Sequence, residues 1–166
     1  MKKISYLLTL LLVFFLLNHS VQAQGSGSDM KHDTTHITFN ESDIKWMDAP
    51  PIFVKGAKMA VLEGDPSKEG EFTVRLSMPA NYRISPHWHP TTENVTVLKG
   101  DFYLGTGDKF DEKAATLLHV GGFASIPATH RHFAFTKGEV IVQVHAMGPF
   151  QLTYVNPADD PSRAKQ

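Results

Sequence analysis

Residues 85–93 read SPHWHPTTE and bring two histidines and a glutamate into one short stretch. Alternate side chains of an extended strand lie on the same face, so His87 and His89 are expected to project together and Trp88 to the other side. Pro90 cannot donate to a sheet ladder, which favours the end of the strand at this point. We therefore predict that Glu93 begins the next strand and that a hairpin folds its carboxylate back beside the two imidazoles.

A second stretch supplies candidates for a fourth ligand. Residues 127–132 read PATHRH and contain His130 and His132. Imidazole nitrogen and carboxylate oxygen suit Zn, Fe, Ni or Mn better than Ca or Mg, which prefer oxygen ligands. The residues therefore predict one divalent transition metal, with either His130 or His132 completing the site.

The sequence around these stretches predicts an all-β fold. From Ile37 onward, short runs of β-branched and aromatic residues alternate with Gly, Pro, Asn and Asp, as is typical of a sandwich or barrel. One helical turn is expected at 111–115, and the glycines at Gly100 and Gly121 predict two hairpin turns. The expected strands are 36–39, 58–62, 72–78, 94–98, 102–104, 116–120, 123–126, 133–135, 140–146 and 151–155.

The two histidine-containing stretches resemble the two motifs of the cupin superfamily. The first motif is similar to HxHx₃Ex₆G at residues 87–100, and the second to Gx₅Px₄H at residues 121–132. The resemblance implies a double-stranded β-helix, or jelly-roll barrel, whose two antiparallel sheets surround a metal-binding pocket. The metal ligands that it implies are His87, His89, Glu93 and His132. From the same resemblance we also expect a homodimer.

Three positions depart from these motifs. Asn81 and Thr129 stand where glycines are expected, and Thr136 stands where an asparagine often closes the second motif. Asparagine tolerates the left-handed backbone conformation that glycine adopts. The change at Thr129 leaves His130 as a competitor for the fourth ligand position, although the offset from the proline of the motif favours His132. A cupin that has lost its metal is the main alternative, but such chains usually lack a ligand side chain.

Two further residues are weaker candidates for the pocket. Gln143 and His145 share a face of the strand expected at 140–146 and could line the barrel interior as substrate-pocket residues. Buried polar groups need hydrogen-bond partners, which would suit a position near the metal. Ordinary exposure to solvent fits the sequence equally well. No separate general base stands out, so no catalytic residue is assigned.

The first residues indicate export. Two lysines precede an apolar stretch of 14 residues, 4–17, and small side chains at Val21 and Ala23 lie three and one residues before the expected cut, which is the pattern of a secretory signal peptide. A membrane anchor is the alternative, but a spanning helix needs roughly 20 apolar residues. We expect a signal peptide at 1–23, a flexible linker at 24–36, a cupin domain at 37–157 and a disordered tail at 158–166. The mature protein would be periplasmic or extracellular, with no membrane segment.

Composition restricts the partners further. The chain has no cysteine, and its length suffices to bury a core without disulfides. Cleavage would remove Lys2 and Lys3 and change the formal net charge from −1 to −3. No basic cluster indicates a nucleic-acid partner. The expected metal site instead favours a small-molecule ligand or substrate.

The motifs leave three functions open. The first is a metalloenzyme that acts on a small organic molecule by dioxygenase-, decarboxylase- or isomerase-like chemistry, in which Glu93 could also accept a proton. The second is a non-catalytic periplasmic binding or sensing module whose metal holds the ligand. In the third, weaker hypothesis the metal only stabilises the barrel.

Overall fold

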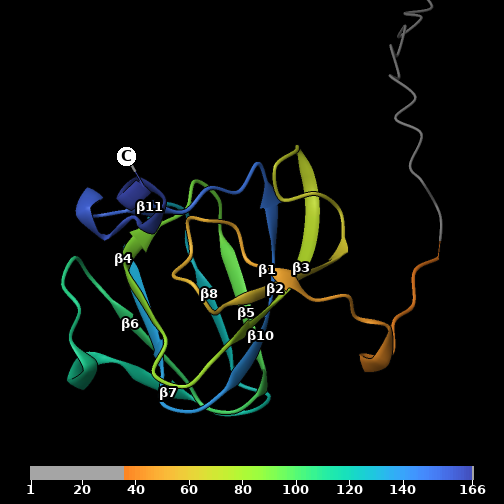
Figure 1. Ribbon diagram of the computed structural model, residues 1–166, viewed down its shortest axis with the longest axis horizontal. Helices are drawn as coiled ribbons and strands as arrows, with labels where there is room; N and C mark the ends of the chain where they lie inside the picture. Colours follow the sequence, from red (N-terminus) through yellow and green to blue (C-terminus); the bar gives the residue numbers. More distant parts are fainter. Residues whose placement is uncertain (1–35, 166) are drawn as a thin grey trace, which may run out of the picture. The chain divides into compact units, whose positions relative to one another are not determined.

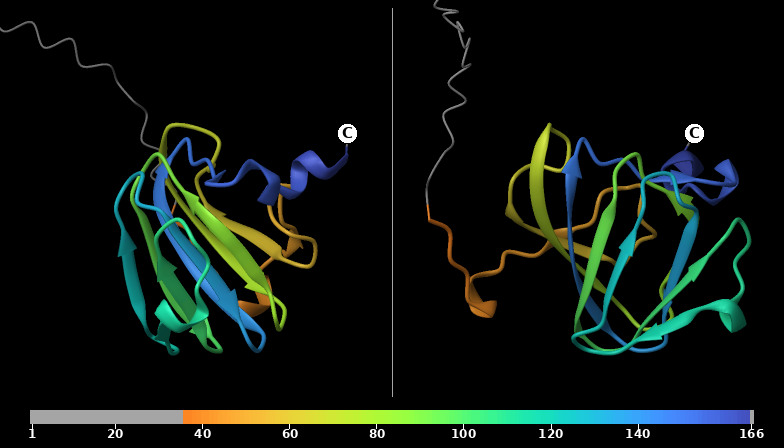
Figure 2. Two further views of the ribbon diagram at one scale, coloured as in Figure 1. Left: turned by 90° about the vertical axis from the view of Figure 1, so that its left-hand side faces the viewer. Right: turned by 180° about the vertical axis from the view of Figure 1, so that it is seen from behind.

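The computed structural model describes residues 36–165, which form two antiparallel sheets that lie face to face (Figures 1 and 2). In spatial order the first sheet contains β1 (Met47–Asp48), β2 (Lys58–Glu63), β3 (Gly70–Met78), β10 (Val140–Gly148), β5 (Glu93–Lys99) and β8 (Phe123–Ile126). The second contains β11 (Thr153–Tyr154), β4 (Arg83–Trp88), β9 (His132–Thr136), β6 (Phe102–Thr106) and β7 (Thr116–Leu118). The 3-10 helices are η1 (Glu41–Asp43), η2 (Glu112–Ala114), η3 (Pro157–Asp159) and η4 (Pro161–Lys165). The predicted all-β jelly roll is thus confirmed.

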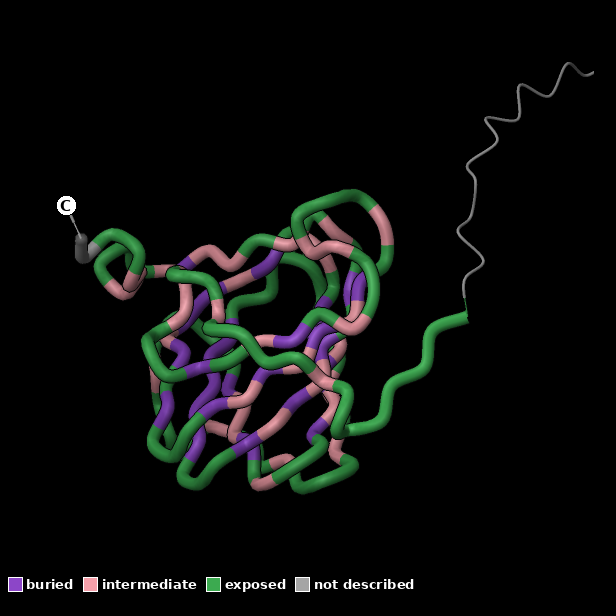
Figure 3. The backbone as a smooth tube through the Cα atoms, turned by 45° about the vertical axis from the view of Figure 1, so that its right-hand side comes forward, coloured by how far each residue is buried: buried purple, intermediate pink, exposed green. Residues whose placement is uncertain are grey.

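The core fills the space between the sheets. Strands β3 and β10 bury alternate residues, and their register pairs Val74 with Val144 and Leu76 with Val142. Figure 3 shows buried segments along the strands, whereas the connections are mostly exposed. Burying a Val or Leu side chain stabilises a fold by about 1.5–3 kcal/mol, so these alternating positions account for the choice of inner face.

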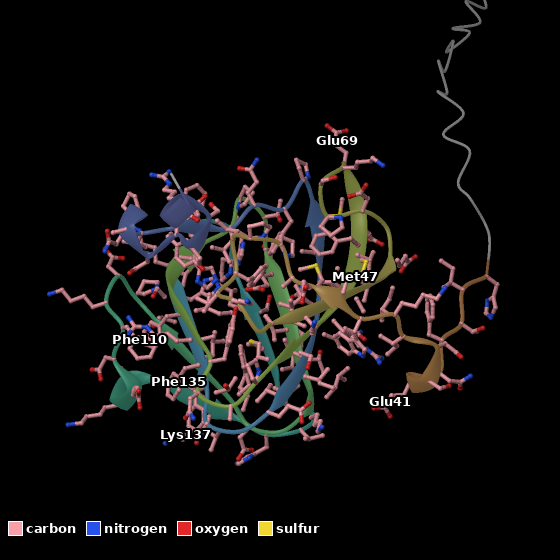
Figure 4. All side chains as sticks on the ribbon, in the orientation of Figure 1. Glu41, Met47, Glu69, Phe110, Phe135 and Lys137 are labelled. Carbon is pink, nitrogen blue, oxygen red and sulfur yellow. The ribbon has the colours of Figure 1, made fainter. Side chains whose placement is uncertain are left out.

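Strand β9 is buried along its whole length because both of its faces are covered. On the face turned away from the interior, Phe135 stacks on Tyr103 with ring centroids 4.6 Å apart. Phe110, from the connection that follows β6, packs against the same Phe135 ring at 5.6 Å (Figure 4). The guanidinium of Arg83 lies 3.7 Å from the centre of the Phe110 ring, a cation–π contact that holds this cover in place.

The two turns predicted as hairpins instead connect the two sheets. Gly100 has a φ of 75°, and a Cβ there would lie 2.2 Å from the carbonyl oxygen of Glu139. However, the turn leads from β5 in the first sheet to β6 in the second, and Gly121 likewise joins β7 to β8. The expected hairpin that leads to Glu93 is wrong for the same reason, because β4 and β5 lie in opposite sheets. A glycine marks a reversal of the chain, but it does not determine which strands then pair.

Other elements also differ from expectation. Residues 36–39 form no strand, and 151–155 contribute only the two residues of β11. The expected disordered tail instead contains η4 and most of η3; the Asn156 side chain caps η3 by accepting from the backbone N–H of Ala158. The helical turn expected at 111–115 is confirmed as η2.

The structure describes only part of the segments predicted at the ends of the chain. The signal peptide at 1–23 and nearly all of the linker at 24–36 lie outside the described residues. Within 36–165, no helix combines the length and hydropathy required to cross a membrane.

The three departures from the motifs have a clear structural role. Asn81 and Thr129 have φ angles of 58° and 64°, so both adopt the left-handed conformation expected of the glycines that they replace. The hydroxyl of Thr136 accepts a hydrogen bond from the backbone N–H of Tyr82 at 3.0 Å and donates to the carbonyl of Pro79 at 2.7 Å. Thr136 therefore ties the end of β9 to the turn that enters β4.

Candidate metal centre

Two neighbouring strands of the second sheet position the histidines. His87 on β4 and His132 on β9 are paired across the strands. The register of β4 shifts between Ile84 and His87. Ile84 and His87 therefore both line the interior, although strict alternation would place them on opposite faces of the strand. His89 follows the end of β4, where its carbonyl accepts the backbone N–H of Thr129 at 2.8 Å.

Glu93 reaches the histidines from the opposite sheet. It begins β5, and its Oε2 lies 3.2 Å from Nε2 of His132 and 3.6 Å from Nε2 of His89. One ring nitrogen from each of the three histidines lies within 4.8 Å of the others. All four side chains are buried. We call His87, His89, Glu93 and His132 the four-residue cluster. The structure brings together the four residues that the cupin resemblance implies as metal ligands.

Backbone carbonyls fix the orientation of all three imidazoles. In each case Nδ1 lies close enough to donate to a carbonyl oxygen: His87 to Ser85 at 2.8 Å, His89 to Gln151 at 2.8 Å and His132 to His130 at 3.0 Å. A carbonyl oxygen can only accept, so these contacts place the proton of a neutral ring on Nδ1 and leave the lone pair on Nε2. Metal-binding histidines commonly donate their other ring N–H in this way.

The Nε2 atoms that face the centre of the cluster lack hydrogen-bond donors. Nε2 of His89 is buried without a hydrogen-bond partner, and Nε2 of a neutral His132 would face the carboxylate oxygen of Glu93 with a lone pair on both sides. Unpaired buried polar atoms are costly, so a cation between them would stabilise the arrangement.

The electrostatics of the cluster argue against protons as that cation. Burial lowers the pKa of His87 well below its usual value, and the neighbouring His132 and His89 lower it further. Burial also lowers the pKa of His89. Burial alone would raise the pKa of Glu93, but the close approach of His132 and His89 lowers it overall. The neutral rings of His87 and His89 beside an ionised Glu93 fit a divalent transition metal such as Fe, Mn, Zn or Ni.

The space beside the cluster is small. A cavity of about 30 Å³ between the sheets is lined by His87, Glu93 and His132 together with apolar side chains. This volume holds a water molecule or two but not an organic substrate.

Gln143 and His145 are not part of this interior, so their predicted placement is corrected. They alternate along β10 with Val142 and Val144, which line the cavity, and therefore point to the other face. Oε1 of Gln143 accepts a hydrogen bond from Arg75 at 3.1 Å, and His145 is exposed. The sequence shows that the two share a face but not which face is buried.

The choice between the two histidines of the second motif is also clear in the structure. His130 is exposed, and it contributes its backbone carbonyl to His132 rather than its ring to the cluster. Sequence reasoning missed Phe150, whose ring stacks on His89 with centroids 4.1 Å apart and planes 17° apart. No motif marks Phe150, because its role depends on a connection that passes the site from a distant part of the chain.

Comparison with known proteins places the fold among cupins. The polyketide cyclase RemF from Streptomyces resistomycificus matches with a TM-score of 0.65 and 18% identity, over 77% of this chain and 91% of its own. A RmlC-like cupin from Shewanella frigidimarina matches with a TM-score of 0.54 and 17% identity, over 69% and 91%. An acetylacetone dioxygenase from Acinetobacter johnsonii matches with a TM-score of 0.56 and 14% identity, over 76% and 80%.

At the sequence level, no curated protein matches the chain. The family model of the ChrR cupin-like domain matches residues 34–151, which include all four residues of the cluster and every strand from β1 to β10. The protein therefore belongs to the ChrR cupin-like domain family.

Proposed function

We propose that this protein is an exported cupin that binds one divalent transition metal through the four-residue cluster and acts on a small organic molecule. The observation that carries the proposal is the set of three imidazoles whose Nδ1 atoms are tied to backbone carbonyls, so that Nε2 lone pairs converge beside Glu93. Fe, Mn, Zn and Ni all suit this donor set.

The chain's own residues would hold and tune the site. The carbonyls that accept from the rings keep each imidazole in the tautomer that a metal requires. The apolar walls of the barrel limit access of water. Glu93, kept ionised at neutral pH by His132 and His89, is the group placed to accept a proton from a substrate. A bound metal would supply Lewis acidity or redox chemistry at any coordination position that the protein leaves open.

The reaction class is proposed at a coarse level. A polyketide cyclase and an acetylacetone dioxygenase share the fold, which supports an enzyme for a small organic molecule by analogy. Dioxygenase-, decarboxylase- and isomerase-like reactions are all open to a histidine–carboxylate metal site.

A second candidate function is a non-catalytic binding or sensing module. The observation in its favour is the cavity of only about 30 Å³ at the cluster, which has room for a water-sized ligand of the metal but not for an organic substrate beside the histidines. In this function the metal would bind a ligand without turnover, or it would only stabilise the barrel.

Elemental analysis of protein purified without added metal tests the site. We expect about one metal per chain in the wild type and its loss in His89→Ala and His132→Ala. His130→Ala is the matched control, because this exposed histidine lies two residues from His132 and should keep the metal. Equal metal content in all variants would contradict the proposed site.

Metal-loaded protein then separates enzyme from binder. Oxygen uptake and product formation with a panel of phenols, keto acids and diketones would identify an enzyme. Saturable thermal stabilisation by one compound without turnover would identify the binding module.

Export and self-association are separate proposals. Expression in a bacterial host should yield, in the exported fraction, a processed chain that starts at Gln24, as intact mass would show. Gel filtration should give the size of a homodimer; the size of a single chain would contradict the proposed dimer.

A further inference from the structure

A second and much larger pocket lies beside the four-residue cluster. It has a volume of about 620 Å³ and is formed by the arm 47–53, strands β2 and β3, and the connection 150–152. Pockets for small molecules commonly have volumes of 300–1,000 Å³ and mostly apolar walls. We call it the apolar pocket; the side chains that matter below are Ile52, Met59, Val61, Phe72, Val74 and Phe150.

The apolar pocket adjoins the cluster at Phe150 and Gln151, whose carbonyl oxygen lies 2.8 Å from Nδ1 of His89. Phe150 lines the pocket, stacks on His89 at 4.1 Å and lies 5.2 Å from Phe72. The inner face of β3 leads from one space to the other: Phe72 and Val74 line the apolar pocket, and Leu76 lines the cavity at the cluster. A molecule in the apolar pocket would therefore lie next to the histidines, behind the Phe150 ring.

The wall of the pocket is anchored to the core of the fold. The buried Tyr154 donates its hydroxyl to the carbonyl of Ile52 at 2.9 Å, and Tyr82 donates to the carbonyl of Val54 at 2.5 Å. These bonds connect the arm to β11 and to the turn that enters β4. Figure 4 labels Met47, which begins β1 and the arm. The arm is thus tied to the neighbourhood of the histidines, because β11 pairs with β4 and places Tyr154 opposite His87.

The charges of the lining indicate the class of ligand. Two carboxylates, Asp48 and Asp65, line the pocket, and no Lys or Arg is found among the described lining residues. Lys58 and Lys68 pair with these carboxylates at 2.6 Å and 2.8 Å. The described lining therefore offers a carboxylate, sulfonate or phosphate group no cation, and the two lysines next to it are already paired, whereas the walls match an apolar surface.

We propose that the apolar pocket binds an uncharged, mainly apolar small molecule and presents it to the four-residue cluster across Phe150. The inference rests on the proposed function in one respect, namely that the bound molecule is the one that the metal site acts on or senses. It adds the class of that molecule: a neutral aromatic or aliphatic compound, not an anionic metabolite.

Fluorescent probe binding to the purified protein tests the pocket directly. Prodan, an uncharged naphthalene ketone, should bind saturably with a blue-shifted emission. Anilinonaphthalene sulfonate, an anionic naphthalene probe, should bind about tenfold more weakly or not at all. Tighter binding of the sulfonate than of prodan would overturn the assigned ligand class.

A pair of valine variants locates the probe. Val61 lines the pocket and is 42% exposed, so Val61→Glu should fold and weaken prodan binding by about tenfold or more by placing a charge in the apolar wall. Val120→Glu is the matched control, because Val120 is 63% exposed and lies outside the pocket lining. Equal effects of the two substitutions, or an effect of neither, would overturn the assignment. Loss of prodan binding at higher protein concentration would also overturn it, since a second copy of the chain would then cover the pocket.

Metal content distinguishes failure of this inference from failure of the proposed function. His132→Ala should lose the metal and keep prodan binding, whereas Val61→Glu should keep the metal and lose prodan. A wild-type protein that holds metal but binds no prodan would overturn the pocket and leave the metal site standing. A protein that binds prodan in a Val61-dependent way without holding metal would support the pocket and contradict the proposed function.

Discussion

Removal of one buried hydroxyl should weaken the connection between the two histidine-bearing strands. Thr136 is 2% exposed, and its hydroxyl accepts from the N–H of Tyr82 and donates to the carbonyl of Pro79. Thr136→Val keeps the shape of the side chain but leaves both backbone groups without this partner. Each unsatisfied buried group costs about 1–3 kcal/mol, so we expect a loss of about 3 kcal/mol in the free energy of unfolding. For a domain of this size, the melting temperature would fall by about 10 °C.

Urea denaturation followed by tryptophan fluorescence is a suitable assay, with a chelator present so that metal binding does not contribute. Thr136→Ser keeps the hydroxyl and should recover most of the loss. Thr106→Val is the matched control, because this exposed threonine should change stability by less than about 0.5 kcal/mol. A loss below about 1 kcal/mol for Thr136→Val, or an equal loss for Thr106→Val, would refute the hydrogen-bond reasoning.

Three further predictions concern packing, pH and metal. Gly105→Ala would place a Cβ 2.0 Å from the fully buried ring of Phe133 and should cost about 1–3 kcal/mol in urea unfolding, whereas Gly138→Ala, with open space at its Cβ, should not. In the folded state the pKa values of His87 and Glu93 lie below their ordinary 6.5 and 4.5, so the unfolded chain binds more protons. The free energy of unfolding of the metal-free protein should therefore be highest above about pH 6.5 and decrease below it. An increase in this free energy on acidification, measured by urea titration, would contradict the prediction. Chelation of a metal present at 100 times its Kd should cost about 2.7 kcal/mol, or about 10 °C in melting temperature; an unchanged melting curve would argue against a metal linked to folding.

The strands were largely predictable because their residues alternate with a period of two. The runs that became β3 and β10 show this alternation clearly, and their buried positions are the apolar ones. The pairing of the strands was not predictable in the same way. The turn at Gly100 has the positive φ that its sequence suggested, yet it carries the chain from one sheet to the other. A turn is a local property of the backbone, whereas the partner of a strand depends on how the whole core closes.

For the cluster, the sequence by itself determined the kinds of ligand and the pairing of His87 with His89 on one side of the chain, because both follow from residue chemistry and local backbone geometry. Only the tertiary structure decided that Glu93 approaches from the opposite sheet, that His132 rather than His130 turns inward, and that Gln143 points away. It also decided which carbonyls orient the rings and that an apolar pocket lies behind Phe150. These features depend on contacts between residues far apart in the chain and on a register shift in β4, and neither leaves a local pattern in the sequence.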